Sequence, residues 1–68
     1  MGVLIKMLGV PTGTVAINRN HIASIESEDR ATTRVSFSGG TFTLVTGKID
    51  DVILHITNPP ASALINYR

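Results

Sequence analysis

The sequence predicts an α+β fold, a small antiparallel β-meander of four to five strands with one C-terminal α-helix packed on the sheet. Apolar and polar residues alternate on both sides of Gly39-Gly40 within segment 33–46, which is typical of a β-hairpin. Three apolar segments of strand length precede this hairpin. After it, apolar residues recur every three and four positions, which indicates a helix.

The position of the turn predicts how the two strands of the hairpin are paired. A two-residue turn at Gly39-Gly40 pairs Phe37 with Phe42 and Val35 with Leu44, and directly opposed residues share a face of the sheet. These four side chains would then face the core, with the polar residues between them in solvent. Gly-Gly suits a type I′ turn, in which both central residues have positive φ.

The strands expected before the hairpin are 3–8, 14–18 and 21–26. The third is expected to contain a bulge, because Ile22 and Ile25 are three positions apart and a regular strand has a period of two. Asn18-Arg19-Asn20 is expected to form a tight polar corner, since Asn accepts turn conformations readily. The polar segment 26–32 is expected to be a solvated loop.

The helix is expected over 48–57. Its apolar face has the spacing i, i+3, i+4 and i+7 and consists of Ile49, Val52, Ile53 and Ile56. Asp50 and Asp51 lie in the first turn, where the helix dipole favours negative charge. Asn58-Pro59-Pro60 is expected to end the helix, because proline cannot continue it.

The composition predicts self-association. The chain has 68 residues, no cysteine and 43% hydrophobic residues, and a domain of this length buries only about 60% of its unfolded surface. We therefore expect a homo-oligomer in which another copy covers apolar side chains. Residues 1–58 are expected to form a single sheet-plus-helix domain, and 59–68 an apolar tail that either lies across a neighbouring subunit or adds a last strand. The residues expected at the oligomer interface are Leu54, Leu64, Ile65 and Tyr67.

No pattern in the chain predicts catalysis, a cofactor or a metal site. There is no Gly-x-Ser-x-Gly motif around any serine, and without cysteine there is no thiolate nucleophile. A metal site would need His21 or His55 and carboxylates to converge from rigid elements, whereas the acidic cluster of the chain is expected in a loop. Asp50 and Asp51 would point about 100° apart on a helix, so they do not form a carboxylate pair. We expect a protein that is not an enzyme.

The charge pattern favours a protein partner. The formal net charge is only +1, and the six Lys and Arg residues are dispersed. We expect a non-enzymatic, self-associating interaction or regulatory module that presents the polar loops 18–21 and 26–32 to a protein. The residues expected to contact it are Asn18, Arg19, Asn20, His21, Arg30 and Arg34.

Two alternatives remain open. One is a nucleic-acid-binding oligomer that uses Arg19, Arg30 and Arg34, because an oligomer multiplies a weak basic patch. The other is a small phage or plasmid structural or accessory protein. There is no leader-like segment and no apolar run near the ~20 residues of a membrane span, so a cytoplasmic location without a membrane partner is expected.

One run of residues carries a family resemblance. It consists of Val15-Ala16-Ile17-Asn18, His21-Ile22, Ile25-Glu26, a polar loop, Thr33-Arg34-Val35, a hairpin glycine, Phe42, Val45 and Ile49-Asp50-Asp51-Val52-Ile53. This order, over residues 3–57, resembles the small flagellar and swarming motility proteins of the FlbD type. The chain departs from that family in segment 9–13, where the family usually has a shorter Asn-Gly-type turn, and in its Pro-Pro tail. The resemblance implies a small non-enzymatic cytoplasmic protein and assigns no site residue.

Overall fold

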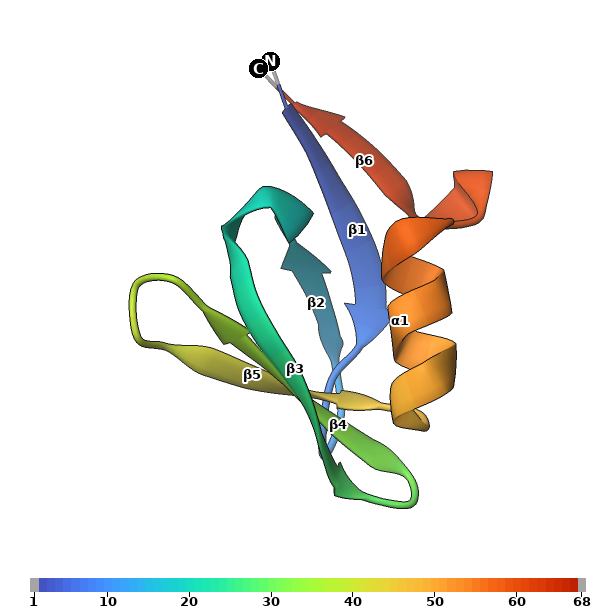
Figure 1. The fold of residues 1–68 in the computed structure, drawn as a ribbon. Helices are drawn as coiled ribbons and strands as arrows, with labels where there is room; N and C mark the ends of the chain where they lie inside the picture. Colours follow the sequence, from blue (N-terminus) through green and yellow to red (C-terminus); the bar gives the residue numbers. More distant parts are fainter. Residues whose placement is uncertain (1, 68) are drawn as a thin grey trace.

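The computed structural model describes residues 2–67 and confirms the α+β class, with two three-stranded antiparallel sheets and one α-helix (Figure 1). The elements are β1 (Gly2–Leu8), β2 (Thr14–Ile17), the 3₁₀ turn η1 (Arg19–His21), β3 (Ile22–Asp29), β4 (Thr32–Phe37), β5 (Phe42–Thr46), α1 (Ile49–Thr57), the 3₁₀ turn η2 (Ala61–Ala63) and β6 (Leu64–Tyr67). The six strands exceed the four to five expected. The helix is followed by η2 and β6, so it is not the C-terminal element.

The first sheet has the strand order β2-β1-β6, with β1 in the centre. The expected strands at 3–8 and 14–18 are confirmed, and Ile5 is paired with Ile17 on β2 and with Leu64 on β6. Segment 59–68 therefore contributes a last strand, which is one of the two arrangements expected for it. Figure 1 shows β6 beside the first part of β1 and α1 beside the rest.

The second sheet has the order β3-β4-β5 and contains the expected bulge in β3, between Ile22 and Ser24. The prediction of a loop over 26–32 was wrong, because β3 continues as a strand to Asp29. A tight turn follows, in which the Ala31 N–H donates to Asp29 Oδ1 at 2.8 Å. This local bond lets the strand continue to within two residues of β4, so the acidic side chains of segment 26–32 lie on a strand.

The β4–β5 hairpin differs from the expected register by one residue. Ser36, not Phe37, is paired with Phe42, and Val35 is paired with Thr43. The Gly40 N–H donates to the Phe37 carbonyl at 3.0 Å, and Gly40 has φ +89°, whereas Gly39 does not have positive φ. These features describe a type I turn followed by a left-handed residue, a loop one residue longer than type I′.

The shift places Phe42 and Leu44 of β5 on the outer face of the sheet. Phe42 is 55% exposed and shares the outer face with Leu44. The prediction that both residues face the core was therefore wrong. Thr33 and Val45 are paired with each other, and their side chains are fully buried on the inner face. A single extra loop residue has this effect because side chains alternate between faces with a period of two.

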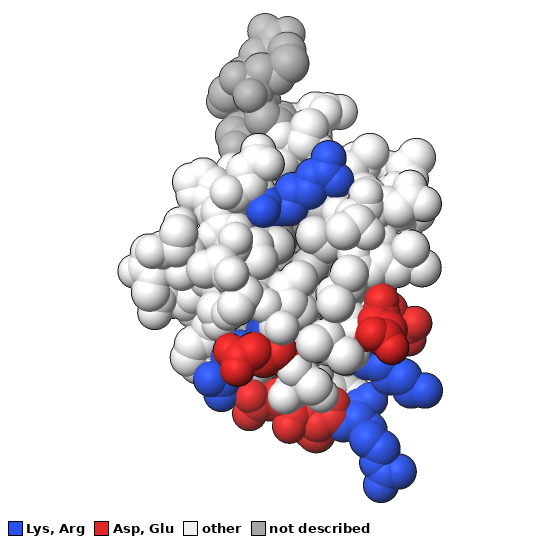
Figure 2. Space-filling model, viewed as in Figure 1, with Lys and Arg blue, Asp and Glu red and all other residues white. Residues whose placement is uncertain are grey.

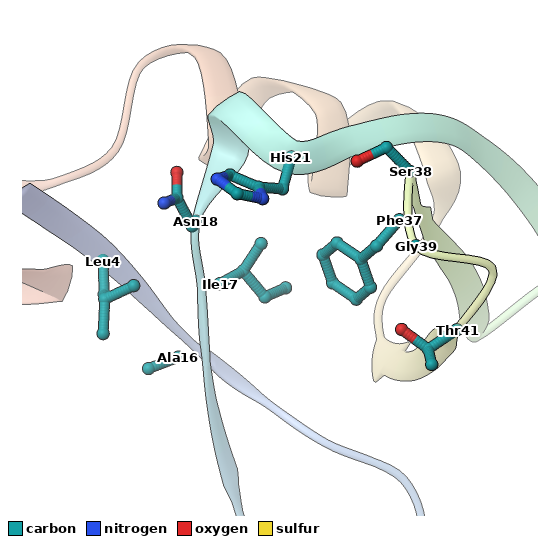
Figure 3. Close-up of a pocket in the computed structure, with 9 residues that line it drawn as sticks. All are labelled: Leu4, Ala16, Ile17, Asn18, His21, Phe37, Ser38, Gly39 and Thr41. Carbon is teal, nitrogen blue, oxygen red and sulfur yellow. The ribbon is translucent and has the colours of Figure 1, made fainter.

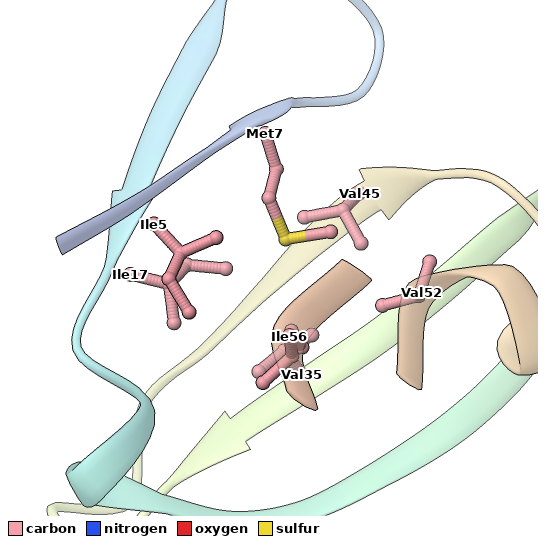
Figure 4. Close-up of a cluster of buried hydrophobic side chains, with 7 residues drawn as sticks. All are labelled: Ile5, Met7, Ile17, Val35, Val45, Val52 and Ile56. Atoms are coloured by element: carbon pink, nitrogen blue, oxygen red, sulfur yellow. The ribbon is translucent and has the colours of Figure 1, made fainter. Parts of the chain in front are cut away.

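The core lies between the two sheets and is closed on one side by α1 (Figure 4). It consists of Ile5, Met7, Ile17, Val35, Val45, Val52 and Ile56. The sheets meet at one corner, where Gly9 forms an antiparallel bridge with Val45 and the Val10 N–H donates to the Leu44 carbonyl at 3.2 Å. Each sheet therefore buries one face against the other and leaves one face outward.

The helix α1 begins and ends close to the predicted positions, but its buried face is narrower. Val52 and Ile56 are buried, whereas Ile53 is 39% exposed, so the prediction that Ile53 belongs to the core was wrong. Ile53 lies one position round the helix from Val52, and the helix is oriented with Val52 and Ile56 toward the sheets. The side chain of Ile53 therefore lies at the margin of the contact.

Two side-chain contacts tie these elements together. His55 Nε2 on α1 lies 3.0 Å from the Lys6 carbonyl oxygen, on the part of β1 beyond its pairing with β6. The buried Thr33 hydroxyl donates to the Gly47 carbonyl at 2.9 Å, which fixes the link between β5 and α1. The helix is thus held to both sheets by polar as well as apolar contacts.

Candidate functional site

A hollow of about 570 Å³ opens between the end of β2 and the loop of the β4–β5 hairpin (Figure 3). We call it the β2 hollow, and its lining residues are Leu4, Ala16, Ile17, Asn18, His21, Phe37, Ser38, Gly39 and Thr41. Figure 3 shows Ile17 and Phe37 side by side at its floor, with Asn18 and His21 at one rim. The lining contains no Asp, Glu, Lys or Arg, so it is an apolar floor with polar edges.

The corner at Asn18 places the polar rim. Asn18 Oδ1 accepts a hydrogen bond from the Asn20 N–H at 3.0 Å, and the His21 N–H donates to the Asn18 carbonyl at 3.1 Å. An Asn side chain that bonds the backbone two residues on is a common way to start such a turn. The predicted polar corner is confirmed, and it brings His21 back over the end of β2.

The six residues predicted to contact a partner do not form one surface. Asn18 and His21 line the β2 hollow, whereas Arg19 and Asn20 line a second hollow of about 540 Å³ on the side of Ile56. The guanidinium Nη1 of Arg19 donates to the Ile56 carbonyl at 3.2 Å, near the C-terminal end of α1. Arg19 therefore helps to satisfy the end of the helix, where free carbonyls favour a cation.

Arg30 and Arg34 lie on the second sheet, away from the Asn18 corner. Arg30 is exposed in the β3–β4 turn. Arg34 Nη2 lies 2.9 Å from Glu28 Oε1, and its guanidinium carbon lies 4.7 Å from the centroid of the Phe42 ring. Because β3 extends to Asp29, Glu28 is held beside Arg34, so this guanidinium already has an anion and an aromatic ring as neighbours.

The charge distribution on the molecular surface is mixed. Figure 2 shows acidic and basic side chains next to each other on the lower part of the face in view, with a basic side chain standing apart above them. No extended basic stripe crosses this face. A nucleic-acid backbone is usually bound by a continuous basic surface, which this face does not provide.

The residues predicted at an oligomer interface are exposed and lie on two elements. Leu54 on α1 is 60% exposed, and Leu64 and Ile65 on β6 are 41% and 37% exposed. Tyr67 is paired with Gly2 along the backbone, but its side chain lies outside the described residues. Sequence reasoning missed Leu8, which is 65% exposed on β1. The signal for it was the charged residue Lys6 two positions earlier, which marks the outward face.

Other kinds of site find no support in the part of the chain that the structure describes. Within residues 2–67, no group of three His, Asp or Glu side chains is placed to hold a metal ion. None of the described helices has the length and apolar character needed to cross a bilayer.

Comparison with known proteins gives no relative: no protein-family model, no curated protein and no solved structure matches the chain. The likeness to the FlbD-type proteins therefore stays a prediction from the order of residues.

Proposed function

We propose that this chain is a non-enzymatic, self-associating protein-interaction module. The observation that carries the proposal is the exposure of large aliphatic side chains on two separate surfaces, with Leu8 on the outer face of β1 and Leu54 on the outward side of α1. Contiguous apolar surface on a small domain is typical of an interaction site. Another copy that covers these surfaces would stabilise the folded chain by mass action.

The molecular surface has room for such a contact. A stable interface buries roughly 800 Å² on each partner, and the chain exposes 4637 Å² in all. The large exposed aliphatic residues supply the apolar part of such a contact.

For a protein partner other than a second copy, we propose the β2 hollow as the contact. Its apolar floor at Ile17 and Phe37 and its rim at Asn18 and His21 combine the two kinds of surface that protein interfaces use, an apolar centre and a polar edge. This assignment retains two residues of the predicted partner-binding set. A regulatory role, and the cytoplasmic location that the FlbD-type resemblance implies, are part of the same proposal.

A protein partner is better supported than nucleic acid. Of the three arginines that a nucleic-acid interface would use, Arg19 bonds the end of α1 and Arg34 is paired with Glu28. Binding a phosphate would require each of these contacts to be shared or given up. The net charge of +1 offers little additional attraction.

Light scattering of the purified full chain and two variants tests the proposal. Leu54→Gln replaces an exposed aliphatic side chain on α1 and is expected to lower the mass in solution, because it removes apolar area from the contact. Ser24→Gln changes an exposed residue on β3 and is the matched control, with no expected change. A mass that is the same for the wild type and Leu54→Gln would count against α1 as part of the interface.

A further inference from the structure

We propose that copies of this chain associate helix to sheet, with the outward face of α1 in one copy packed on the outer face of the first sheet in the next. In this contact Asp50 lies against Lys6 and Leu54 lies against Leu8. The proposal rests on self-association, the function proposed above, and names the surfaces and the pairing that produce it.

The outer face of the first sheet is apolar around one cation. On β1, Ile5 and Met7 point into the core, so Leu4, Lys6 and Leu8 point outward. The strand pairing places Ala16 of β2 opposite Lys6 and Ile65 of β6 opposite Leu4 on the same face. Lys6 is the only charged residue among the described strand side chains of this face. Asp51 and His55 of α1 lie at its edge, where they line hollows together with Leu8.

The outward face of α1 is apolar around an anion. Val52 and Ile56 point into the core, so Leu54 is directed away from the sheets, and Asp50 lies one turn before it on the same side. Both Asp50 and Leu54 are exposed, and Ile53 lies beside them at the margin. The other carboxylate of the first turn, Asp51, points about 100° away from Asp50 and lines a hollow with Leu8 of its own copy.

The two faces match in spacing as well as in charge. Residues four apart on a helix, such as Asp50 and Leu54, have Cβ atoms about 6 Å apart. Residues two apart on a strand, such as Lys6 and Leu8, are separated by about 7 Å. One helix can therefore place its carboxylate on the Lys6 ammonium group and its leucine on Leu8 at the same time.

The alternative contacts between copies do not pair opposite charges. Two outer sheet faces stacked on each other would bring two Lys6 side chains near one another in the centre of the contact. Two α1 faces packed in parallel would do the same with Asp50, and packed antiparallel they would place each Asp50 at the end of a helix that contains no Lys or Arg. Like charges across an interface are unfavourable, so helix on sheet is the arrangement in which the exposed apolar residues are covered and the charges are opposite.

A helix-to-sheet contact is heterologous, because it joins two different surfaces. Each copy then offers one helix face and one sheet face, and the assembly either closes into a ring or grows as a chain. Because the two surfaces differ, the contact can be tested by mixing two variants that each associate weakly alone.

The test is sedimentation velocity on Lys6→Glu and Asp50→Lys, alone and as an equimolar mixture. Each reversal by itself is expected to weaken association about tenfold or more, because it opposes like charges at the contact. In the mixture, Glu at position 6 of one variant meets Lys at position 50 of the other, and the wild-type pair forms at the remaining contacts. In a chain or an even-membered ring the mixture is therefore expected to regain the wild-type mass. In an odd-membered ring, where two like copies must meet, it is expected to form mixed oligomers heavier than either variant alone.

Arg30→Glu is the matched control, because it reverses an exposed charge in the β3–β4 turn, and it should leave the mass unchanged. Far-UV circular dichroism checks that every variant is folded. If the wild type associates and neither reversal alters its mass, or if the mixture contains no species heavier than either variant alone, the helix-to-sheet contact is wrong while self-association stands. A monomeric wild type would instead overturn the proposed function itself.

Discussion

Arg34 lies over the ring of Phe42, with its guanidinium carbon 4.7 Å from the ring centroid, on the outer face of the second sheet. The two residues share this face because Phe42 is paired with Ser36 and Arg34 with Leu44. An aromatic ring that is more than half exposed is thus partly covered by a cation. The relationship depends on the register of the hairpin, and the four stability predictions that follow test that register and the core.

The two phenylalanines are expected to differ in their contribution to stability. Phe37 packs against the core cluster, so Phe37→Ala should lower the free energy of unfolding by about 2 kcal/mol or more. Phe42→Ala removes an exposed ring and a cation–π contact, so it should cost about 1 kcal/mol or less. Urea denaturation measures both, and a larger loss for Phe42→Ala would contradict the observed register.

The hairpin glycines provide a matched pair of substitutions. A Cβ at either Gly39 or Gly40 meets no atom within 4 Å, so only the backbone conformation distinguishes them. Gly40 has φ +89°, and Gly40→Ala should lower stability by about 1 kcal/mol or more. Gly39→Ala should be neutral or slightly stabilising. Equal losses for the two variants in thermal unfolding would indicate the type I′ turn instead.

The helix face can be tested at two isoleucines. Ile56 is 4% exposed and lies in the core, so Ile56→Ala should lower the free energy of unfolding by about 2–5 kcal/mol. Ile53→Ala should cost much less, because its side chain lies at the margin. If Ile56→Ala does not fold, Ile56→Val, with an expected cost of about 1 kcal/mol, keeps the comparison measurable. Similar losses for Ile53→Val and Ile56→Val would show that the helix is rotated.

The buried hydroxyl of Thr33 is expected to stabilise the junction between β5 and α1. Thr33→Val keeps the shape of the side chain but leaves the Gly47 carbonyl without this donor, at a cost of about 1–3 kcal/mol. Thr32→Val, at the neighbouring half-buried position, is the control and should change stability by less than about 0.5 kcal/mol. Chemical denaturation that ranks the two variants equally would remove the proposed role of the hydroxyl.

Much of the fold follows from local patterns. The spacing of Ile22 and Ile25 predicted the bulge in β3, and the two prolines after Asn58 predicted where α1 ends. The hairpin register was not predictable in the same way, because Ser38-Gly39-Gly40 satisfies both a two-residue and a three-residue loop. The choice between them depends on burying Thr33 with its hydroxyl bonded to Gly47, a contact fourteen residues away in sequence.

The candidate site was predicted only in part. The Asn18 corner is a local turn, so its position at the rim of the β2 hollow follows from neighbouring residues. The partners of Arg19 and Arg34 involve the end of a helix and an adjacent strand, which the pattern of charges does not reveal. The exposure of Leu8 could have been predicted, because the charged Lys6 two positions earlier marks the outward face of β1.

The nucleic-acid alternative can be tested by measuring binding to oligonucleotides. Because the net charge is +1 and two of the three arginines are engaged within the chain, we expect no binding to generic single-stranded or duplex oligonucleotides at physiological salt. Fluorescence anisotropy at high micromolar protein measures this. Tight binding that falls steeply with salt, and that is lost when Arg19, Arg30 and Arg34 are changed to Gln, would support the nucleic-acid alternative instead.

Sedimentation equilibrium of the unmodified full chain over a wide range of concentrations tests self-association most directly. The exposed aliphatic surfaces on β1 and α1 predict a mass that rises above 7.3 kDa toward a multiple of that value as concentration increases. A single species of 7.3 kDa at every concentration, with a folded circular dichroism spectrum, would contradict the account.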